Sequence, residues 1–335
     1  MKKIIIAILV VVIGITAYLA YTVFGSVTKQ STQVVIYLDR EDNLDSLKNK
    51  LICETSPSTT IGFDISVKLL RMNKIRTGRY TLEPGISMMD ILRMVRSHSQ
   101  SPINVVIPSV RTLDMLVGRI SSQLMIDSAE IAQALQNDSL ITSLGYNNQS
   151  LPGLFIPNTY EMYWDISTED FLNRMKKENN KFWNKERKAK AEAMELDENQ
   201  VATLASIVDS ETAYNPEKAR IAGLYLNRIK KGMLLQSDPT VIFAIGDFSI
   251  RRVLNSHLTV DSPYNTYLYK GLPPGPIRIP SIAGLDAVLN HETNNYLYMC
   301  AKEDFSGSHN FASTYNEHLA NARRYVKALN QRGIK

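Results

Sequence analysis

The sequence lacks the residue patterns that mark several common kinds of functional site. Only two cysteines occur, Cys53 and Cys300, and the five histidines are scattered along the chain. No C-x-x-C or H-E-x-x-H spacing is present, so we predict neither a metal site nor a cofactor. In an oxidising compartment the two cysteines could form a disulfide, but two separately buried thiols fit the sequence equally well.

The sequence also lacks a strong excess of charge of one sign. It has 38 Lys and Arg residues against 33 Asp and Glu residues, and two of the basic residues are Lys2 and Lys3 at the N-terminus. The rest of the chain is therefore nearly balanced, and nothing in it resembles a basic nucleic-acid-binding module. We predict no nucleic-acid partner.

Long hydrophobic runs are absent except for one at the N-terminus. Residues Ile4 to Phe24 contain no charge and no proline. As a helix, this run is long enough to cross the hydrocarbon core of a membrane. Because Lys2 and Lys3 precede this run, we expect residues 1–3 in the cytoplasm, a membrane helix at 4–24, a tether at 25–32 and the remainder outside. A cleaved signal peptide is the alternative, but the run is longer than a usual signal-peptide core and no clear A-x-A site follows.

The remainder of the chain reads as an α+β protein. Short strands at residues 33–38, 78–82 and 104–107 alternate with amphipathic helices, as in small α+β modules. A stretch rich in Asn, Ser and Gly from Asp138 to Gly153 indicates a boundary. A charged helix is predicted from Thr168 to about Glu195, and another helix from Glu217 to Lys230.

The segment that follows Asp197 places a carboxylate on the apolar side of a helix. Asp197 and Gln200 have the spacing of a capping box, and apolar residues then recur at helical spacing through Leu204 and Val208. Glu211 lies in line with these two, whereas Asp209 falls on the flank of the helix. Burial there raises the pKa of a carboxyl, and a protonated carboxyl is the proton donor that glycosidic bond cleavage needs. The alternative is a helix-terminal Glu that bonds a neighbouring turn or pairs with a buried Arg.

Three later segments combine rigid turns with polar and aromatic side chains. They are Leu235–Thr240, Asp261–Tyr267 and Gly271–Ile277. Sugar-binding clefts use such groups, since planar polar side chains bond hydroxyls and aromatic rings cover sugar faces. Asp-Pro and Pro-Gly turns also occur in purely structural loops, but three of them downstream of Glu211 favour a cleft.

Together these motifs resemble one known family. The ordered motifs are Leu204–Thr212, Asn227-Arg228, Leu235–Val241, Tyr264–Tyr267, Gly271–Ile277 and Tyr296–Tyr298, preceded by Gly78–Ser87 and Phe155–Tyr160. They are similar to the membrane-anchored endolytic murein transglycosylases, the MltG or YceG-like family, over nearly all of the chain after the membrane segment. Two departures stand out: Asp209-Ser210 replaces the expected Glu-Lys pair, and His309–Ser313 matches the usual C-terminal motif only loosely.

The resemblance implies an architecture and a location. It implies a small LysM-like α+β subdomain at 33–150 that binds peptidoglycan, and a larger, mainly helical YceG-like catalytic domain with short strands at 151–335. The expected location is the bacterial cytoplasmic membrane, with a single spanning helix and an extracytoplasmic C-terminal domain. The expected partners are that membrane, peptidoglycan glycan strands and penicillin-binding proteins or other cell-wall synthases.

The resemblance also implies a reaction. The enzyme would be a lyase that cuts the MurNAc-β-1,4-GlcNAc bond of nascent strands, leaves 1,6-anhydro-MurNAc ends and so terminates glycan elongation. Glu211 is at the position of the family's catalytic glutamate, and would first donate a proton to the leaving oxygen and then accept one from the muramic acid 6-hydroxyl. By analogy, the residues expected to bind substrate are Gln236, Asp238, Tyr264, Asn265 and Tyr267.

Two other functions remain open from the sequence. One is a muramidase that hydrolyses the same bond with Asp238 or Asp261 as a second carboxylate, as ordinary glycosidases do. The other is a membrane-tethered scaffold without catalytic activity that binds peptidoglycan and cell-wall synthases.

Overall fold

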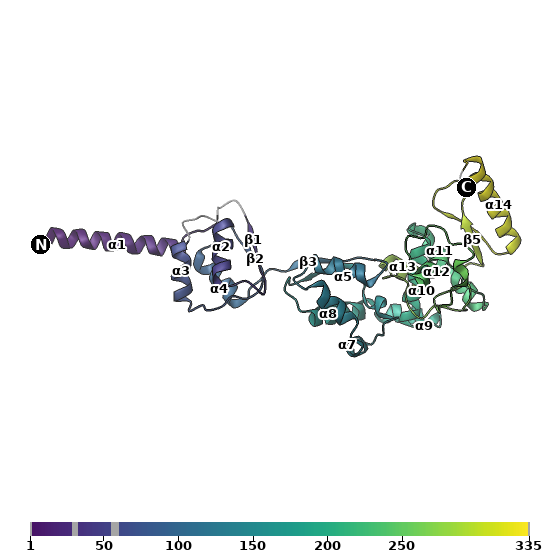
Figure 1. Cartoon of the computed structure of the whole chain (residues 1–335), viewed down its shortest axis with the longest axis horizontal. Helices are drawn as coiled ribbons and strands as arrows, with labels where there is room; N and C mark the ends of the chain where they lie inside the picture. Colours follow the sequence, from purple (N-terminus) through teal and green to yellow (C-terminus); the bar gives the residue numbers. More distant parts are fainter. Residues whose placement is uncertain (1, 29–32, 55–59, 334–335) are drawn as a thin grey trace. The chain divides into compact units, whose positions relative to one another are not determined.

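The computed structural model describes residues 2–28, 33–54 and 60–333 and shows a mixed helix and strand fold with small sheets (Figure 1). The chain folds into two compact units. Unit 1 contains the chain up to Val105 with two later segments, and unit 2 contains the rest; the later segments of unit 1 are Ser122–Ile126 and Tyr160–Ser167. The predicted division into 33–150 and 151–335 stays a prediction, although the main break between the units lies earlier in the chain. Residues 29–32 of the predicted tether, Met1 and residues 334–335 lie outside the described residues.

Helix α1 (Lys2–Phe24) is the apolar segment predicted from the sequence. Its length and composition suffice to cross a membrane, and its large side chains are exposed over most of its length. Its C-terminal end differs, because Val23 is only 2% exposed and α1 contacts α3 and α4 there. A Cβ at Gly62 would lie 2.0 Å from the Thr22 carbonyl oxygen, so only glycine permits this close approach.

The part of unit 1 that follows α1 is built around one antiparallel strand pair covered by helices. Its elements are β1 (Val34–Leu38), α2 (Leu44–Glu54), α3 (Thr60–Leu69), β2 (Gly78–Leu82) and α4 (Met88–Ser97). The register pairs Ile36 with Tyr80, and alternate residues of β2 are buried, as expected for a strand with one face on a core. Ser87 caps α4 by accepting a hydrogen bond from the Asp90 N–H, as its position before the helix predicts.

The next stretch of chain, most of which belongs to unit 2, forms short helices and a strand pair. The elements are β3 (Ile103–Ile107), α5 (Leu113–Ser121), α6 (Ser128–Leu135), α7 (Asp138–Ser143), η2 (Leu151–Leu154), β4 (Asn158–Met162), α8 (Thr168–Phe182) and α9 (Lys185–Ala193). The single helix predicted from Thr168 to Glu195 is wrong, because α8 ends at Phe182 and Asn184 caps a new helix with its side chain. The start of the predicted boundary segment is itself helical, since it forms α7, which Asn137 caps.

The core of unit 2 is built around α10 (Glu198–Glu211). Asp197 and Gln200 form both hydrogen bonds of the predicted capping box. Residues Val201 to Asp209 are all buried, because α11 (Asn215–Lys230), α12 (Asp238–Ile245) and α13 (Ile282–Leu289) pack around the helix. This packing fixes the C-terminal end of α10, where Glu211 lies.

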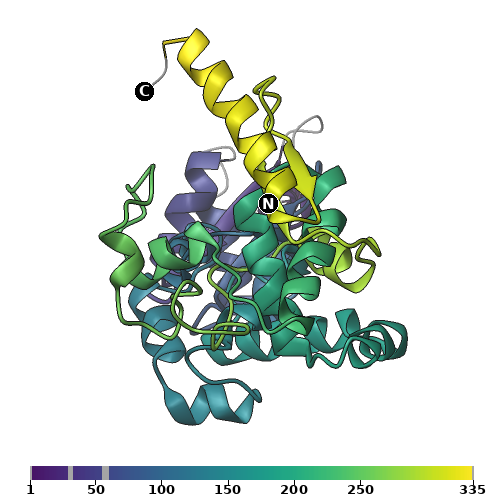
Figure 2. The ribbon, with the colours of Figure 1, turned by 90° about the vertical axis from the view of Figure 1, so that its right-hand side faces the viewer.

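A hairpin and a long helix complete unit 2. Strands β5 (Tyr298–Ala301) and β6 (His309–Ala312) pair antiparallel, and α14 (Tyr315–Gln331) packs beside them. Figure 2 shows α14 in yellow alongside this hairpin. Between α12 and α13 lies mostly irregular chain, with one short 3-10 helix, η3 (His257–Thr259).

Candidate active site

Glu211 is the last residue of α10, and two neighbouring segments hold one of its carboxylate oxygens. The Tyr225 hydroxyl on α11 donates a hydrogen bond to Glu211 Oε1 at 2.7 Å. The Ser237 hydroxyl, which immediately precedes α12, donates to the same oxygen at 2.5 Å. No described residue donates to Oε2. The carboxyl is thus fixed through one oxygen, and the other is available to carry or transfer a proton.

The surroundings of Glu211 favour its protonated form. Burial raises the pKa of the carboxyl, and the negative charge of Asp238 acts in the same direction. The hydrogen bonds from Ser237 and Tyr225 lower the pKa, but the net shift is upward. Since Glu211 still lines a cavity, it has the two properties of a general acid, a raised pKa and access to a ligand.

A second set of hydrogen bonds positions Ser237. Its backbone N–H donates to Thr266 Oγ1 at 3.0 Å, and its carbonyl accepts from the Thr240 hydroxyl at 2.7 Å. The preceding residue, Gln236, has a φ of 51°, an unusual value for a residue other than glycine. Backbone strain of this kind persists where the surroundings enforce it, often at functional sites.

The cavity beside Glu211 has a volume of about 250 Å³. Its lining residues are Glu211, Leu224, Tyr225, Arg228, Leu235, Gln236, Asp238, Tyr267, Met299, Cys300, Ala301 and His309. Of the substrate-binding residues expected from the sequence, Gln236, Asp238 and Tyr267 therefore lie with Glu211. The Tyr267 hydroxyl donates to Asp238 Oδ1 at 2.6 Å, which joins α12 to the loop before α13.

The other two expected substrate-binding residues lie elsewhere. Asn265 is completely buried, and its side-chain amide donates to the carbonyls of Leu258 and Val260 while its Oδ1 accepts from the Tyr267 N–H. The structure thus gives Asn265 a framework role in its own loop. The Tyr264 ring packs on Phe243 with 4.7 Å between centroids and lines a different cavity.

Asp261, the alternative second carboxylate, also lies outside the Glu211 cavity. Its Oδ1 accepts a hydrogen bond from the Tyr269 hydroxyl at 2.5 Å. Asp238 is therefore the one other carboxylate, among the described residues, that lines this cavity.

His309 enters the cavity from β6 and is held by a buried carboxylate. Its Nδ1 lies 3.0 Å from Glu217 Oε2, and its backbone N–H donates to Glu217 Oε1 at 3.0 Å. These two contacts with Glu217 fix the orientation of the imidazole ring beside the cavity. The sequence signalled His309 only as part of a loosely matching motif, and Glu217 only as the start of a helix.

The helix periodicity alone places Asp209 on the flank of α10, outside the packed side. The structure shows instead that Asp209 is buried. It forms a buried ion pair with Lys218 at 2.7 Å, and Ser281 donates to it through both its N–H and its hydroxyl. A Cβ at Gly284 would lie 2.6 Å from its carboxylate oxygens. The prediction from periodicity failed here because α11 and α13 pack against the flank of α10 that carries Asp209. Helical periodicity along one segment does not show which neighbouring helices cover each face.

The cysteines are both unpaired. Cys53 is exposed, whereas Cys300 on β5 lines the Glu211 cavity, where burial raises the pKa of its thiol. Among the described residues, no group of three or more His, Cys, Asp or Glu side chains is arranged to hold a metal ion.

Comparison with known proteins agrees with this geometry. The model of the YceG-like family matches residues 36–324. The endolytic murein transglycosylase of Bacillus subtilis (strain 168) is 27% identical, over 81% of this chain and 78% of that protein. The endolytic murein transglycosylase of Streptococcus pneumoniae (strain R6) is 25% identical, and the match spans only about half of its length, 53%.

A solved structure extends the likeness to three dimensions. The 2.6 Å crystal structure of a YceG-like protein from Listeria monocytogenes superposes with a TM-score of 0.57 at 25% identity, covering 86% of this chain and 98% of that one. With a family match over most of the sequence and a shared fold, the chain belongs to the YceG-like family.

Proposed function

We propose that this protein is a membrane-anchored endolytic murein transglycosylase that cleaves the MurNAc-β-1,4-GlcNAc bond inside peptidoglycan glycan strands and leaves 1,6-anhydro-MurNAc ends. The single observation that carries the proposal is the setting of Glu211. It combines a raised pKa, one oxygen fixed by Tyr225 and Ser237, and a second oxygen without a donor among the described residues at a cavity. The names of the Bacillus and Streptococcus relatives point to the same reaction.

One carboxyl suffices for both steps of this reaction. Glu211 in its protonated form donates its proton to the glycosidic oxygen as the bond to C1 breaks. The resulting carboxylate then accepts the proton of the muramic acid 6-hydroxyl, whose oxygen closes onto C1. No water enters the product, and Glu211 ends the cycle protonated. We assign substrate binding around this step to Gln236 and Tyr267.

Asp238 is the residue through which a hydrolase would operate. A muramidase needs a second carboxylate as nucleophile or base, and Asp238 lines the same cavity. However, its Oδ1 is occupied by the Tyr267 hydroxyl, which suits a positioning and sugar-binding residue. We therefore assign Asp238 to substrate binding.

The deciding experiment is mass spectrometry of the products that the purified protein releases from uncrosslinked glycan strands. The lyase gives anhydro ends, whereas hydrolysis adds one water and gives reducing muramic acid. Asp238→Asn should lower the rate but leave the anhydro product unchanged. If the wild-type digest contained reducing ends, and Asp238→Asn lost both these ends and the activity, the protein would be a hydrolase and not a lyase. A protein that binds glycan without releasing either product would be a scaffold.

The N-terminal part is assigned to placement of the enzyme. We propose that α1 anchors the chain in the bacterial cytoplasmic membrane with the catalytic part outside. We also propose that residues 33–150 form a LysM-like module that binds peptidoglycan, and that the enzyme acts on strands that cell-wall synthases have just made. The apolar composition of α1 and the two lysines before it support this orientation.

A further inference from the structure

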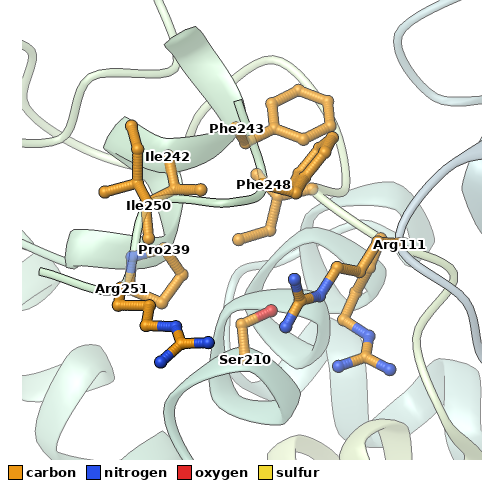
Figure 3. Close-up of a pocket in the computed structure, with 10 residues that line it drawn as sticks. Arg111, Ser210, Pro239, Ile242, Phe243, Phe248, Ile250 and Arg251 are labelled. Atoms are coloured by element: carbon orange, nitrogen blue, oxygen red, sulfur yellow. The ribbon is translucent and has the colours of Figure 1, made fainter. Parts of the chain in front are cut away.

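A second cavity of unit 2 is lined by three arginines and several apolar side chains. It has a volume of about 360 Å³, and we call it the arginine cavity. Its lining residues are Arg111, Ser210, Pro239, Ile242, Phe243, Phe248, Ile250, Arg251, Ile277 and Arg278. Figure 3 shows Arg251 and Arg111 on opposite sides, the Ser210 hydroxyl between them, and the rings of Phe243 and Phe248 on the same wall.

The positive charge of this cavity is not balanced by its own lining. No carboxylate is among the lining residues. Arg111 and Arg251 are exposed, and neither forms an ion pair or donates a hydrogen bond to any residue that the structure describes. Guanidinium groups that line one cavity without an acidic partner favour an anionic ligand. The best such ligand is a carboxylate or phosphate, which can accept two parallel hydrogen bonds from one guanidinium.

Arg278 gives the cavity a fixed and partly desolvated charge. Its terminal nitrogens donate to the Asp209 carbonyl, the Ser109 carbonyl and the Ser109 hydroxyl, while its Nε is buried without a hydrogen-bond partner. Burial lowers the pKa of this guanidinium, the charge of Asp209 opposes that shift, and the charge of Arg111 adds to it. An anion placed between the two arginines would relieve this repulsion.

The arginine cavity and the Glu211 cavity are lined by consecutive residues at two places in the chain, although they share no lining residue. Ser210 lines the first and Glu211 the second, and Pro239 lines the first while Asp238 lines the second. Consecutive Cα atoms are only about 3.8 Å apart. The backbone that lines the two cavities is thus continuous at both places, so a ligand with a sugar at Glu211 and a branch of a few residues has a span suited to reaching the arginines.

We propose that the arginine cavity binds a carboxylate of the peptide stem that the muramic acid of the glycan carries, so that the enzyme prefers stem-bearing strands. This rests on the proposed function, because it takes the strand bound at Glu211 to be peptidoglycan. The stem leaves the muramic acid through its lactyl group, and each of its residues adds about 3.3–3.6 Å of reach. The phenyl and isoleucine side chains of the wall suit the methyl groups of the alanine residues in the stem.

The test compares strands with intact stems, strands whose stem carboxyls are chemically amidated, and strands stripped of stems by an amidase. For the wild type, kcat/KM should be higher for intact stems by about fivefold to thirtyfold, the range for one charge-assisted contact. Arg251→Met and Arg111→Met should each reduce this ratio toward one. Both side chains are exposed and bond no described residue, so these variants should fold. Arg252→Met, the adjacent exposed arginine outside the cavity, is the matched control and should keep the wild-type ratio.

A binding measurement separates this proposal from the proposed function. Glu211→Gln protein can be titrated with N-acetylmuramyl-L-alanyl-D-glutamate and with its amidated form, without any cleavage. Tighter binding of the free acid, lost in Glu211→Gln/Arg251→Met, supports the arginine cavity even if the reaction proved to be hydrolysis. Equal affinity for the two forms would overturn it, and so would a wild-type preference that survives Arg251→Met. Displacement by inorganic phosphate more readily than by the free acid would assign the cavity to a phosphate-bearing ligand instead.

Discussion

Replacing Glu211 by Gln tests the proposed chemistry most directly, and the structure sets what the change removes. The amide oxygen of Gln can take the place of Oε1 and keep the hydrogen bonds from Tyr225 and Ser237. The amide nitrogen replaces Oε2, which accepts no hydrogen bond from a described residue. Packing is therefore unchanged, and any loss of stability should stay below about 1 kcal/mol.

The loss of activity should be large, because Gln can neither donate the proton nor accept the next one. General acid–base groups contribute about 10²–10⁴-fold, and Glu211 serves both steps. We expect a loss at the top of this range or beyond, and 10⁴-fold corresponds to about 5 kcal/mol in the barrier. The assay is quantitative mass spectrometry of anhydro-muropeptides, with glycan cosedimentation to show that binding persists.

The same variant makes a prediction about pH and stability. Because the pKa of Glu211 is raised in the folded state, the folded protein binds more protons than the unfolded chain above the ordinary Glu pKa of about 4.3. Wild-type stability should thus fall as pH rises through the folded pKa, and Glu211→Gln should not show this loss. Relative to the wild type, the variant should become more stable toward neutral pH in denaturant unfolding.

A matched control is Glu192→Gln, which makes the same chemical change on the exposed face of α9. It should leave both activity and the pH dependence of stability unchanged. Wild-type rates for Glu211→Gln, or equal losses in the two variants, would refute the assignment of Glu211 as the acid.

Three further changes test other parts of the structure. Tyr225→Phe removes one hydrogen bond that lowers the pKa of Glu211, so the alkaline limb of the kcat/KM–pH profile should move to higher pH; a limb that stays in place would contradict the role of this hydrogen bond. Asp209→Asn should lower the free energy of unfolding by about 3–5 kcal/mol in denaturant unfolding, because it leaves the buried Lys218 without its ion-pair partner. The double variant Asp209→Asn/Lys218→Met should recover part of this loss. If the single variant were as stable as the wild type, the ion pair would not be desolvated. A chain that begins at Tyr21 keeps the buried end of α1 and should cut glycan in solution at the wild-type rate. Loss of cleavage by this folded protein would show that residues 1–20 take part in the reaction.

The local features of the chain could be predicted from the sequence. The apolar helix α1, the capping box of α10 and the caps of α4 depend on residues within one or two helical turns, and the structure confirms them. The placement of Glu211 on the packed side of α10 follows from the same periodicity. The prediction of one charged helix failed at Asn184, whose side chain caps a new helix. The pattern of charged residues continues across this position, so it gave no sign that the helix ends there.

The composition of the site depended on tertiary contacts. Asp238 and Asn265 look alike in the sequence as polar residues of turn segments, yet one lines the cavity and the other is buried with its amide bonded within its own loop. Tyr225 reads as a core residue, but its hydroxyl reaches Glu211. His309 meets the cavity from a hairpin almost a hundred residues farther along the chain.

The sequence by itself thus determined the apolar helix α1, the mixed helix and strand fold and the helix that carries Glu211, since these follow from composition, periodicity and capping over short distances. Only the tertiary structure decided which oxygen of Glu211 is held, which polar loop residues meet it, that Asp209 is buried in an ion pair, and that three arginines from separate segments share one cavity. The physical reason is that burial and hydrogen bonding are settled by what packs against a side chain. The partners here come from helices and loops that the chain brings together only when it folds.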